Sequence, residues 1–303
     1  MKIPFRTLSL SFSALFAILS IVSLLTFGLN VGIDFKGGQL LELRFTESTS
    51  TSQVRQALEA GERDAHLPHS TVAETSASTF LIRTATDDPN QIDAIRANLK
   101  DLVGESTEIR FESVGPTVGK DLTRKAVYGV VLASLGIILY IAWAFRRVPA
   151  PTNSWRFGLT AIVALLHDLL ITAGAFALLG RFFGFEVDSL FITAMLTVMG
   201  FSVHDTIVTY DRIRENLLHH PGVEFESVVN ASIRQTIVRS LNTSLTLILV
   251  LLSILILGGS TIRPFIAALT IGVTVGTYSS IFVAAQLLVV WQHWAMQRAK
   301  PSH

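Results

Sequence analysis

Apolar residues in this chain gather in six long runs, and a more polar stretch separates the first run from the other five. The first run covers residues 8–29, which is long enough for a helix to cross about 30 Å of hydrocarbon. The others lie at about 126–145, 157–179, 189–210, 237–257 and 265–291. This pattern predicts six transmembrane helices.

Residues 30–120 have a different pattern, because charges return and apolar residues alternate with polar ones. The pattern predicts strands at 40–45, 70–75, 79–84 and 108–113, with helices at 52–60 and 90–102. The resulting βαββαβ order is that of a ferredoxin-like domain, in which two helices cover one face of a four-stranded antiparallel sheet. We therefore expect an α-helical polytopic membrane protein with an α+β ferredoxin-like domain between helices 1 and 2. That fold hosts many functions and indicates no chemistry.

Composition supports the membrane class: 50% of the 303 residues are hydrophobic, only 16% are charged, and the mean hydropathy is +0.51. A soluble domain has about 25% charged residues. The net charge of +1 indicates no nucleic-acid partner. The absence of cysteine excludes disulfides and thiolate metal sites.

The basic start of the chain and the run 8–29 could also form a cleaved signal peptide. The apolar run is longer than the 7–15 residues of a signal peptide core. Residues 26–30 also offer no small-x-small cleavage site. We therefore expect an uncleaved first span.

Basic residues in the short loops indicate the orientation, because they favour the cytoplasmic side. Both termini are predicted to be cytoplasmic, with the domain at 30–120 outside. The residues on the cytoplasmic side are Lys2, Arg6, Arg146, Arg147, Arg156, Arg212, Arg214, Arg234, Arg298 and Lys300, against Arg181 and Arg263 opposite.

The expected organisation is a first span within 1–29, an external domain at 30–120, a five-helix membrane domain at 121–297 and a cytoplasmic tail at 298–303. The cytoplasmic loop 211–236 carries apolar residues at nearly helical spacing, which predicts an amphipathic helix leading into span five. Those residues are Val223, Phe225, Val228, Val229, Ile233 and Ile237. Such a helix either rests on the bundle as a connector or serves as a docking site for another protein.

Asp205 and Arg239 lie inside predicted spans four and five, near their cytoplasmic ends. Antiparallel neighbouring helices would place the two residues at similar depth. Ionisable residues within membrane spans are costly and usually functional. An acid whose distance to an arginine changes would bind and release a proton. A static ion pair between two helices is the alternative.

Asp168, near the middle of predicted span three, is the second intramembrane acid. His167 and His204 each precede an aspartate, and successive helical residues point about 100° apart. We therefore expect no direct pairing between either histidine and the acid that follows it. Gly272, Gly276 and the Gly258-Gly259 pair are expected to allow close helix approach. Motifs for nucleophilic catalysis, phosphate binding or metal binding do not rise above chance, so we expect no enzyme and no ATP hydrolysis.

Four motifs, in this order along a six-span chain, resemble the SecF members of the SecD/SecF family of bacterial protein-translocase subunits. The resemblance covers essentially the whole chain, and the family is related to the resistance-nodulation-division exporters. The motifs are Gly32-Ile33-Asp34-Phe35-Lys36-Gly37-Gly38, His167-Asp168, the stretch 200–216, and Arg239-Ser240-Leu241-Asn242-Thr243-Ser244-Leu245.

The resemblance implies a subunit that works with SecD and uses the proton-motive force to assist late stages of preprotein export and membrane-protein insertion through SecYEG. It implies an inner-membrane location, preprotein substrates, and YajC and YidC as further candidate partners. Protons would be the coupling ion, and no other cofactor is implied. Asp205 and Arg239 match the family's proposed proton-path pair, and Asp168 matches its acid in span three. His204 stands where many relatives have asparagine, while Gly32, Asp34, Gly37 and Gly38 form the motif beside span one.

Two other functional classes stay open from the residues. One is a proton-driven exporter half for small molecules or lipids, for which the external domain is small. The other is a passive assembly factor in the membrane, whose buried charges only hold helices together.

Overall fold

The computed structural model describes residues 5–64, 70–86, 88–146, 148 and 152–299. It divides into two compact units. The helical unit comprises residues 1–29, 128–185 and 190–303, and the sheet unit comprises residues 30–127 and 186–189. The sheet unit thus includes a short segment that follows the third long helix, in addition to the domain predicted at 30–120.

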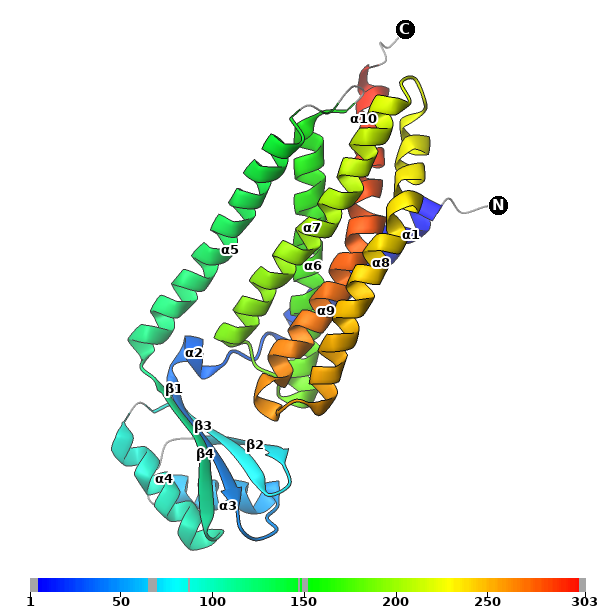
Figure 1. The fold of residues 1–303 in the computed structure, drawn as a ribbon. Coiled ribbons are helices and arrows are strands. Elements are labelled where there is room, and N and C mark those ends of the chain that lie inside the picture. The colour runs from blue at the N-terminus through cyan, green and yellow to red at the C-terminus, as the bar shows by residue number, and fades with distance from the viewer. Residues whose placement is uncertain (1–4, 65–69, 87, 147, 149–151, 300–303) are drawn as a thin grey trace. The chain divides into compact units, whose positions relative to one another are not determined.

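Six helices among the described residues are long and apolar enough to cross a membrane, as the hydropathy pattern predicts, so the chain is a membrane protein. Five of them are α1 (Phe5–Phe27), α5 (Pro116–Ala144), α6 (Ser154–Phe183), α7 (Ser189–His219) and α8 (Phe225–Leu257). After the short helix η1 (Ser260–Ile262), the sixth consists of α9 (Arg263–Ser279), the π-helical turn η2 (Ser280–Ala284) and α10 (Ala285–Ala299). Figure 1 shows α8 and α9 side by side, joined by the turn at η1.

The helices extend beyond the predicted apolar runs, because a hydropathy pattern detects the part of a helix that suits lipid and not its polar ends. The loop predicted at 211–236 is therefore much shorter: α7 continues to His219, and α8 begins at Phe225. Phe225, Val229 and Ile233 are buried in the core of the bundle, whereas Val223 is exposed. The amphipathic segment is the first part of α8, and its apolar face packs on the bundle as a connector.

Aromatic residues from α6, α7 and the turn that follows α5 pack together in this core. Phe145 and Phe157 stack with ring centroids 5.3 Å apart, and Tyr210 meets Phe157 edge-on at 4.9 Å. All three side chains are buried. Aromatic pairs of this kind stabilise beyond the apolar area that they bury.

Glycines bring the helices close together, as predicted at Gly272 and Gly276. A Cβ on Gly272 would lie 2.3 Å from Val198 Cγ2, and one on Gly276 would lie 3.1 Å from Ser202 Cβ. Both glycines of α9 therefore sit against α7. Gly258 instead ends α8 as its C-cap, so its role is helix termination rather than helix packing.

The sheet unit contains β1 (Gly38–Phe45), α3 (Thr51–Asp64), β2 (Ser70–Ser76), β3 (Thr79–Thr84), α4 (Pro89–Leu102) and β4 (Ser106–Val114). The strand order is β2-β3-β1-β4, and every neighbouring pair is antiparallel. Helices α3 and α4 pack on one face of this sheet (Figure 1). Their shared core contains Leu41, Leu43, Phe45, Phe80 and Ile82 from strands and Val54, Ala57, Leu58, Ile92, Ile95 and Leu99 from helices.

Candidate functional site: two buried carboxylates and a π-helical turn

Asp168 lies on α6 with no exposed surface, although it carries an ionisable group. Two serine hydroxyls donate hydrogen bonds to its Oδ2, each at 2.6 Å: Ser202 from α7 and Ser279 from the end of α9. The carboxylate therefore joins three helices at one oxygen.

His167 approaches the other oxygen of the same carboxylate, with Nδ1 3.1 Å from Asp168 Oδ1. The expectation that His167 would point away from its neighbour is therefore wrong. Successive residues diverge at Cβ, but the imidazole is long enough to fold back along the helix. The opposite ring atom, Nε2, is buried and has no hydrogen-bond partner among the described residues.

Asp205 lies on α7 and is also buried, with 4% of its surface exposed. Ser280 donates a hydrogen bond from Oγ to Asp205 Oδ2 at 3.2 Å. Ser279 and Ser280 are consecutive, so adjacent hydroxyls of the last span hold the two acids. The sequence named Asp168 and Asp205 separately, and the structure brings them to the same turn.

That turn is the π-helical segment Ser280–Ala284. A π-helical turn departs from the regular i to i−4 hydrogen bonds, and such turns are frequent at functional sites. The Tyr210 hydroxyl donates to the carbonyl of Ala284 at 3.2 Å and contacts Thr160 Oγ1 at 2.7 Å. A tyrosine from α7 thus partners a carbonyl within the irregular turn.

Arg239 does not form an ion pair with Asp205 in the described part of the chain. It is exposed and lines a cavity of about 410 Å³ between α7 and α8, together with Asp211, Arg212 and Glu215. Asp205 and Arg239 stay apart although the sequence predicts similar positions along their helices. Asp205 faces Ser280, whereas Arg239 faces the later, polar turns of α7. His204 is also exposed, and within the described ranges it has no hydrogen bond.

The glycine motif forms a tight connection inside the sheet unit. Gly37 and Gly38 have φ values of +78° and +121°, which favour glycine. A Cβ on Gly38 would also lie 2.5 Å from the carbonyl oxygen of Thr84. The turn ends the short helix α2 (Ile33–Lys36) and starts β1, and it places Asp34 beside Ser189.

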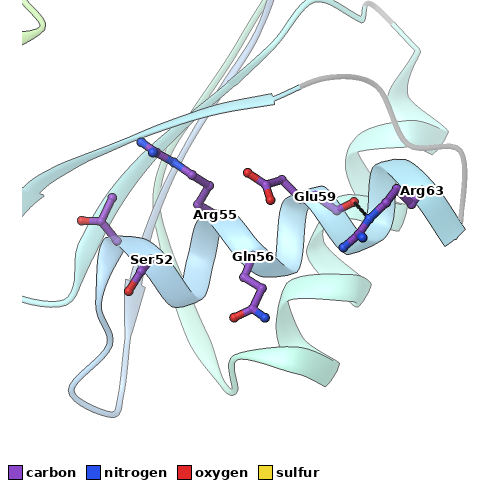
Figure 2. A pocket seen from close by; sticks show the side chains of 6 residues that line it. Ser52, Arg55, Gln56, Glu59 and Arg63 are labelled. Carbon is purple, nitrogen blue, oxygen red and sulfur yellow. Dashed lines mark hydrogen bonds between the residues drawn. The ribbon is translucent and has the colours of Figure 1, made fainter.

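Two further features lie away from this turn. A hollow of about 470 Å³ lies along α3, lined by Thr51, Ser52, Arg55, Gln56, Glu59 and Arg63 (Figure 2). Arg63 Nε bonds the carbonyl of Glu59 in its own helix, so its side chain folds along α3 (Figure 2). The side chains that line this hollow are mostly exposed, and their arrangement indicates no particular ligand.

The second feature is the group Glu224, Glu226 and His293, whose potential ligand atoms lie within 4.8 Å of one another. Arg6 Nη1 is already 3.0 Å from Glu226 Oε2. This cation neutralises the acid, so the group is an ion-pair cluster rather than a metal centre.

Sequence reasoning missed Ser202, Ser279, Ser280 and Tyr210 as members of the site. Hydroxyl residues are common in membrane helices, where they also bond their own backbone. The sequence does contain two consecutive serines, Ser279 and Ser280, in the middle of an apolar run. They indicate a site only once the structure places them beside the two acids.

A family model for the C-terminal region of the protein export membrane proteins SecD/SecF matches residues 94–294. A model for the SecD/SecF GG motif matches residues 22–49, which contain Gly37 and Gly38. The protein translocase subunit SecF of Thermobaculum terrenum is 45% identical over 292 residues, covering 93% of this chain and 90% of that protein. The SecF subunit of Anaerolinea thermophila is 39% identical over 307 residues, covering 98% and 97%.

Longer relatives contain the same region. Protein translocase subunit SecDF of Bacillus subtilis is 35% identical over 286 residues, covering 93% of this chain but 36% of that protein. The crystal structure of SecDF from Thermus thermophilus, described as a translocon-associated membrane protein, superposes with a TM-score of 0.82 at 34% identity. It covers 96% of this chain and 38% of that one. The buried acids and the glycine motif therefore occur in a chain that belongs to the SecD/SecF family of protein export membrane proteins.

Proposed function

We propose that this chain, an accessory subunit of Sec protein translocation, uses proton movement through its helix bundle to assist late stages of preprotein export and membrane-protein insertion. The observation that supports this proposal is the pair of buried carboxylates, Asp168 and Asp205, held by consecutive serines at a π-helical turn. A protein that is driven by a proton gradient needs such groups, because they can bind and release protons inside the membrane.

The serine hydroxyls provide a way to convert protonation into movement. Ser279 Oγ lies 3.2 Å from the carbonyl of Gly276, and Ser280 Oγ lies 3.1 Å from that of Thr277, so each has a second acceptor in its own helix. A hydroxyl donates one proton at a time. An ionised carboxylate holds the serine between helices, whereas a protonated carboxyl releases it to its own backbone.

In this mechanism Asp205 is the principal proton carrier and Asp168 the second. Arg239, in the polar cavity between α7 and α8, would set the potential near the cytoplasmic end of the path, and His204 would be an additional titratable group. One proton crossing 100 mV supplies about 2.3 kcal/mol, so several are needed for a large movement. Protons are the only coupling agent proposed, and ATP hydrolysis by this chain is no part of the mechanism.

SecD is the proposed partner, and support comes from relatives in which both names describe one chain, SecDF. The SecYEG channel, YajC and YidC are proposed on the family resemblance alone. The basic loops support an inner-membrane protein with cytoplasmic termini. The βαββαβ element order and the strand order β2-β3-β1-β4 support a ferredoxin-like assignment for the domain outside. The family match favours translocation over export of small molecules or a passive assembly role.

The test is export of a secreted reporter in a strain depleted of its own subunit and supplied with this chain carrying Asp205→Asn. We expect export to lose its gradient-dependent stimulation while the variant still co-purifies with its partner subunit. Asp101→Asn, at an exposed position on α4, is the matched control and should export normally. Normal export by Asp205→Asn would contradict the proton-carrier assignment and leave Asp205 as a packing contact.

A further inference from the structure

Residues 186–189, which run from the loop after α6 to the first residue of α7, are built into the sheet unit although they are distant from it in sequence. Two backbone hydrogen bonds hold the segment. The Gly32 amide donates to the Val187 carbonyl at 2.9 Å, and the Val187 amide donates to the Asn30 carbonyl at 2.8 Å. Val31 and Val187 thereby form a parallel β-bridge.

A largely buried ion pair adds to this attachment. Arg83 on β3 places Nε 2.6 Å from Glu186 Oε1, and the two side chains are only 19% and 15% exposed. A Cβ on Gly32 would lie 3.4 Å from Glu186 Oε2, an ordinary contact distance, so Gly32 lies directly beside the carboxylate. Breaking a buried pair by removing one partner is costly, because the remaining charge stays buried.

Asp34 supplies the last contact, which it makes with the first residue of α7. Its Oδ2 accepts hydrogen bonds from the Ser189 amide at 2.8 Å and from the Ser189 hydroxyl. Ser189 is the first residue of α7. The first amides of a helix lack partners within the helix and favour negative charge. Asp34 therefore meets α7 at the end where a carboxylate stabilises it.

We propose that Asp34 is a positioning residue for the start of α7, and that residues 186–189 hold this end of the helix that carries Asp205 within the sheet unit. The proposal rests on the proposed function, because α7 runs unbroken from Ser189 to His219 and includes both Ser202 and Asp205. The contacts at Glu186, Val187 and Ser189 hold the segment within the sheet unit, so the start of the helix that carries the proton site depends on them.

A cysteine pair tests this attachment directly, since the natural chain contains no cysteine. Asp34→Cys combined with Ser189→Cys replaces the hydrogen bonds with a bond that a reductant can open. Gradient-dependent export should fall by about fivefold or more in the reduced form, the low end of typical coupling between sites. Oxidation should restore it, while export without a gradient and co-purification with the partner stay unchanged. Full stimulation in the reduced form would overturn the proposal.

Charge exchange provides an independent variant should the cysteine pair fail to assemble. Arg83→Glu and Glu186→Arg should each lower gradient-dependent export, and the double variant should recover it, because the pair re-forms with reversed charges. Normal gradient-dependent export by both single variants would contradict the proposal. A double variant that folds and assembles but does not recover gradient-dependent export would also contradict it. Asp205→Asn in the same assay separates the two hypotheses: if it retains stimulation, the proton function fails, whatever the other variants do.

Discussion

The proposed mechanism depends most on three serine residues, through their hydroxyl groups. Ser202 and Ser279 donate to the same oxygen of Asp168, and Ser280 donates to Asp205. A buried acid of this kind depends on its donors, because removal of one takes a hydrogen bond from a polar group that water cannot reach. The acids identify the site, and the serines determine how protonation affects the helices.

Ser279→Ala should destabilise the bundle by about 1–3 kcal/mol, since the buried carboxyl group of Asp168 loses a hydrogen bond. Thermal unfolding of the purified full chain in detergent measures the effect. The matched control is Ser253→Ala, because Ser253 Oγ bonds only the Leu249 carbonyl of its own exposed helix face. Equal melting temperatures for the two variants would show that Ser279 contributes nothing to the Asp168 site.

Glu186 should titrate above the ordinary range for glutamate, because burial raises the pKa of its carboxyl more than Arg83 lowers it. The folded state therefore binds this proton more tightly than the unfolded chain does. The contribution of Glu186 to stability is greatest below the unfolded pKa and is lost as pH rises through the folded pKa. Glu186→Gln should remove this part of the pH dependence.

Carboxyl NMR of the full chain labelled at glutamate measures that titration. Arg83→Gln should raise the pKa of Glu186 further, because the positive charge that favours the carboxylate is removed. A pKa of Glu186 at or below the ordinary glutamate value, or no upward shift in Arg83→Gln, would contradict the burial of this ion pair.

Close helix packing around the site depends on small residues of α9 and on the irregular turn that follows. Gly272 and Gly276 bring α9 against Val198 and Ser202. Ser279 at the end of α9 then reaches Asp168 on α6, and Ser280 at the start of the π-helical turn reaches Asp205 on α7. Packing without voids leaves such contacts little room to adjust. The geometry of the acids is thus set by backbone approach as well as by hydrogen bonds.

Gly272→Ala should cost about 1–3 kcal/mol, because the new methyl group would overlap the Val198 side chain and force the helices apart. Gly136→Ala on α5 is the control, since nothing lies within 4 Å of its Cβ. Relief of glycine's backbone entropy should leave that variant neutral or about 0.5–1 kcal/mol more stable. Denaturation in detergent compares the two, and equal losses would rule out close packing at Gly272.

The whole molecule consists of a helical unit that contains the acids and a sheet unit that contains the glycine motif. The chain passes between them more than once, and residues 186–189 belong to the sheet unit although both neighbours along the chain are long membrane helices. The first residue of α7 thus belongs to the sheet unit, and the rest of that helix belongs to the helical unit.

Orientation can be tested with single cysteines, because the natural chain offers no other thiol. A membrane-impermeant maleimide added to intact spheroplasts should label Glu47→Cys in the sheet unit and leave Val223→Cys unlabelled. Both positions are exposed, so accessibility within the protein does not separate them. Val223→Cys should react only after the membrane is opened. The reverse pattern would invert the proposed topology.

Much of the fold follows from local pattern. Residues 70–76 and 79–84 alternate and pair as predicted strands, and the six apolar runs become six long helices. Helix ends were predicted less well, because the polar turns of α7 beyond Asp211 carry no hydropathy signal. At the site, Asp168 and Asp205 stand out because charge is rare in such runs. The sequence did not show that Asp205 and Arg239 lie on different faces in this structure, because depth alone does not fix the direction in which a side chain points.

The sequence by itself determined the class of protein, the number of spans, the order of elements in the domain and the two acids, because each depends on residue type and near neighbours. Only the tertiary structure decided which hydroxyl meets which carboxylate, where Arg239 faces and that residues 186–189 join the sheet unit. These contacts join residues far apart in the chain. Their geometry depends on how helices rotate and pack, and no local pattern records that rotation.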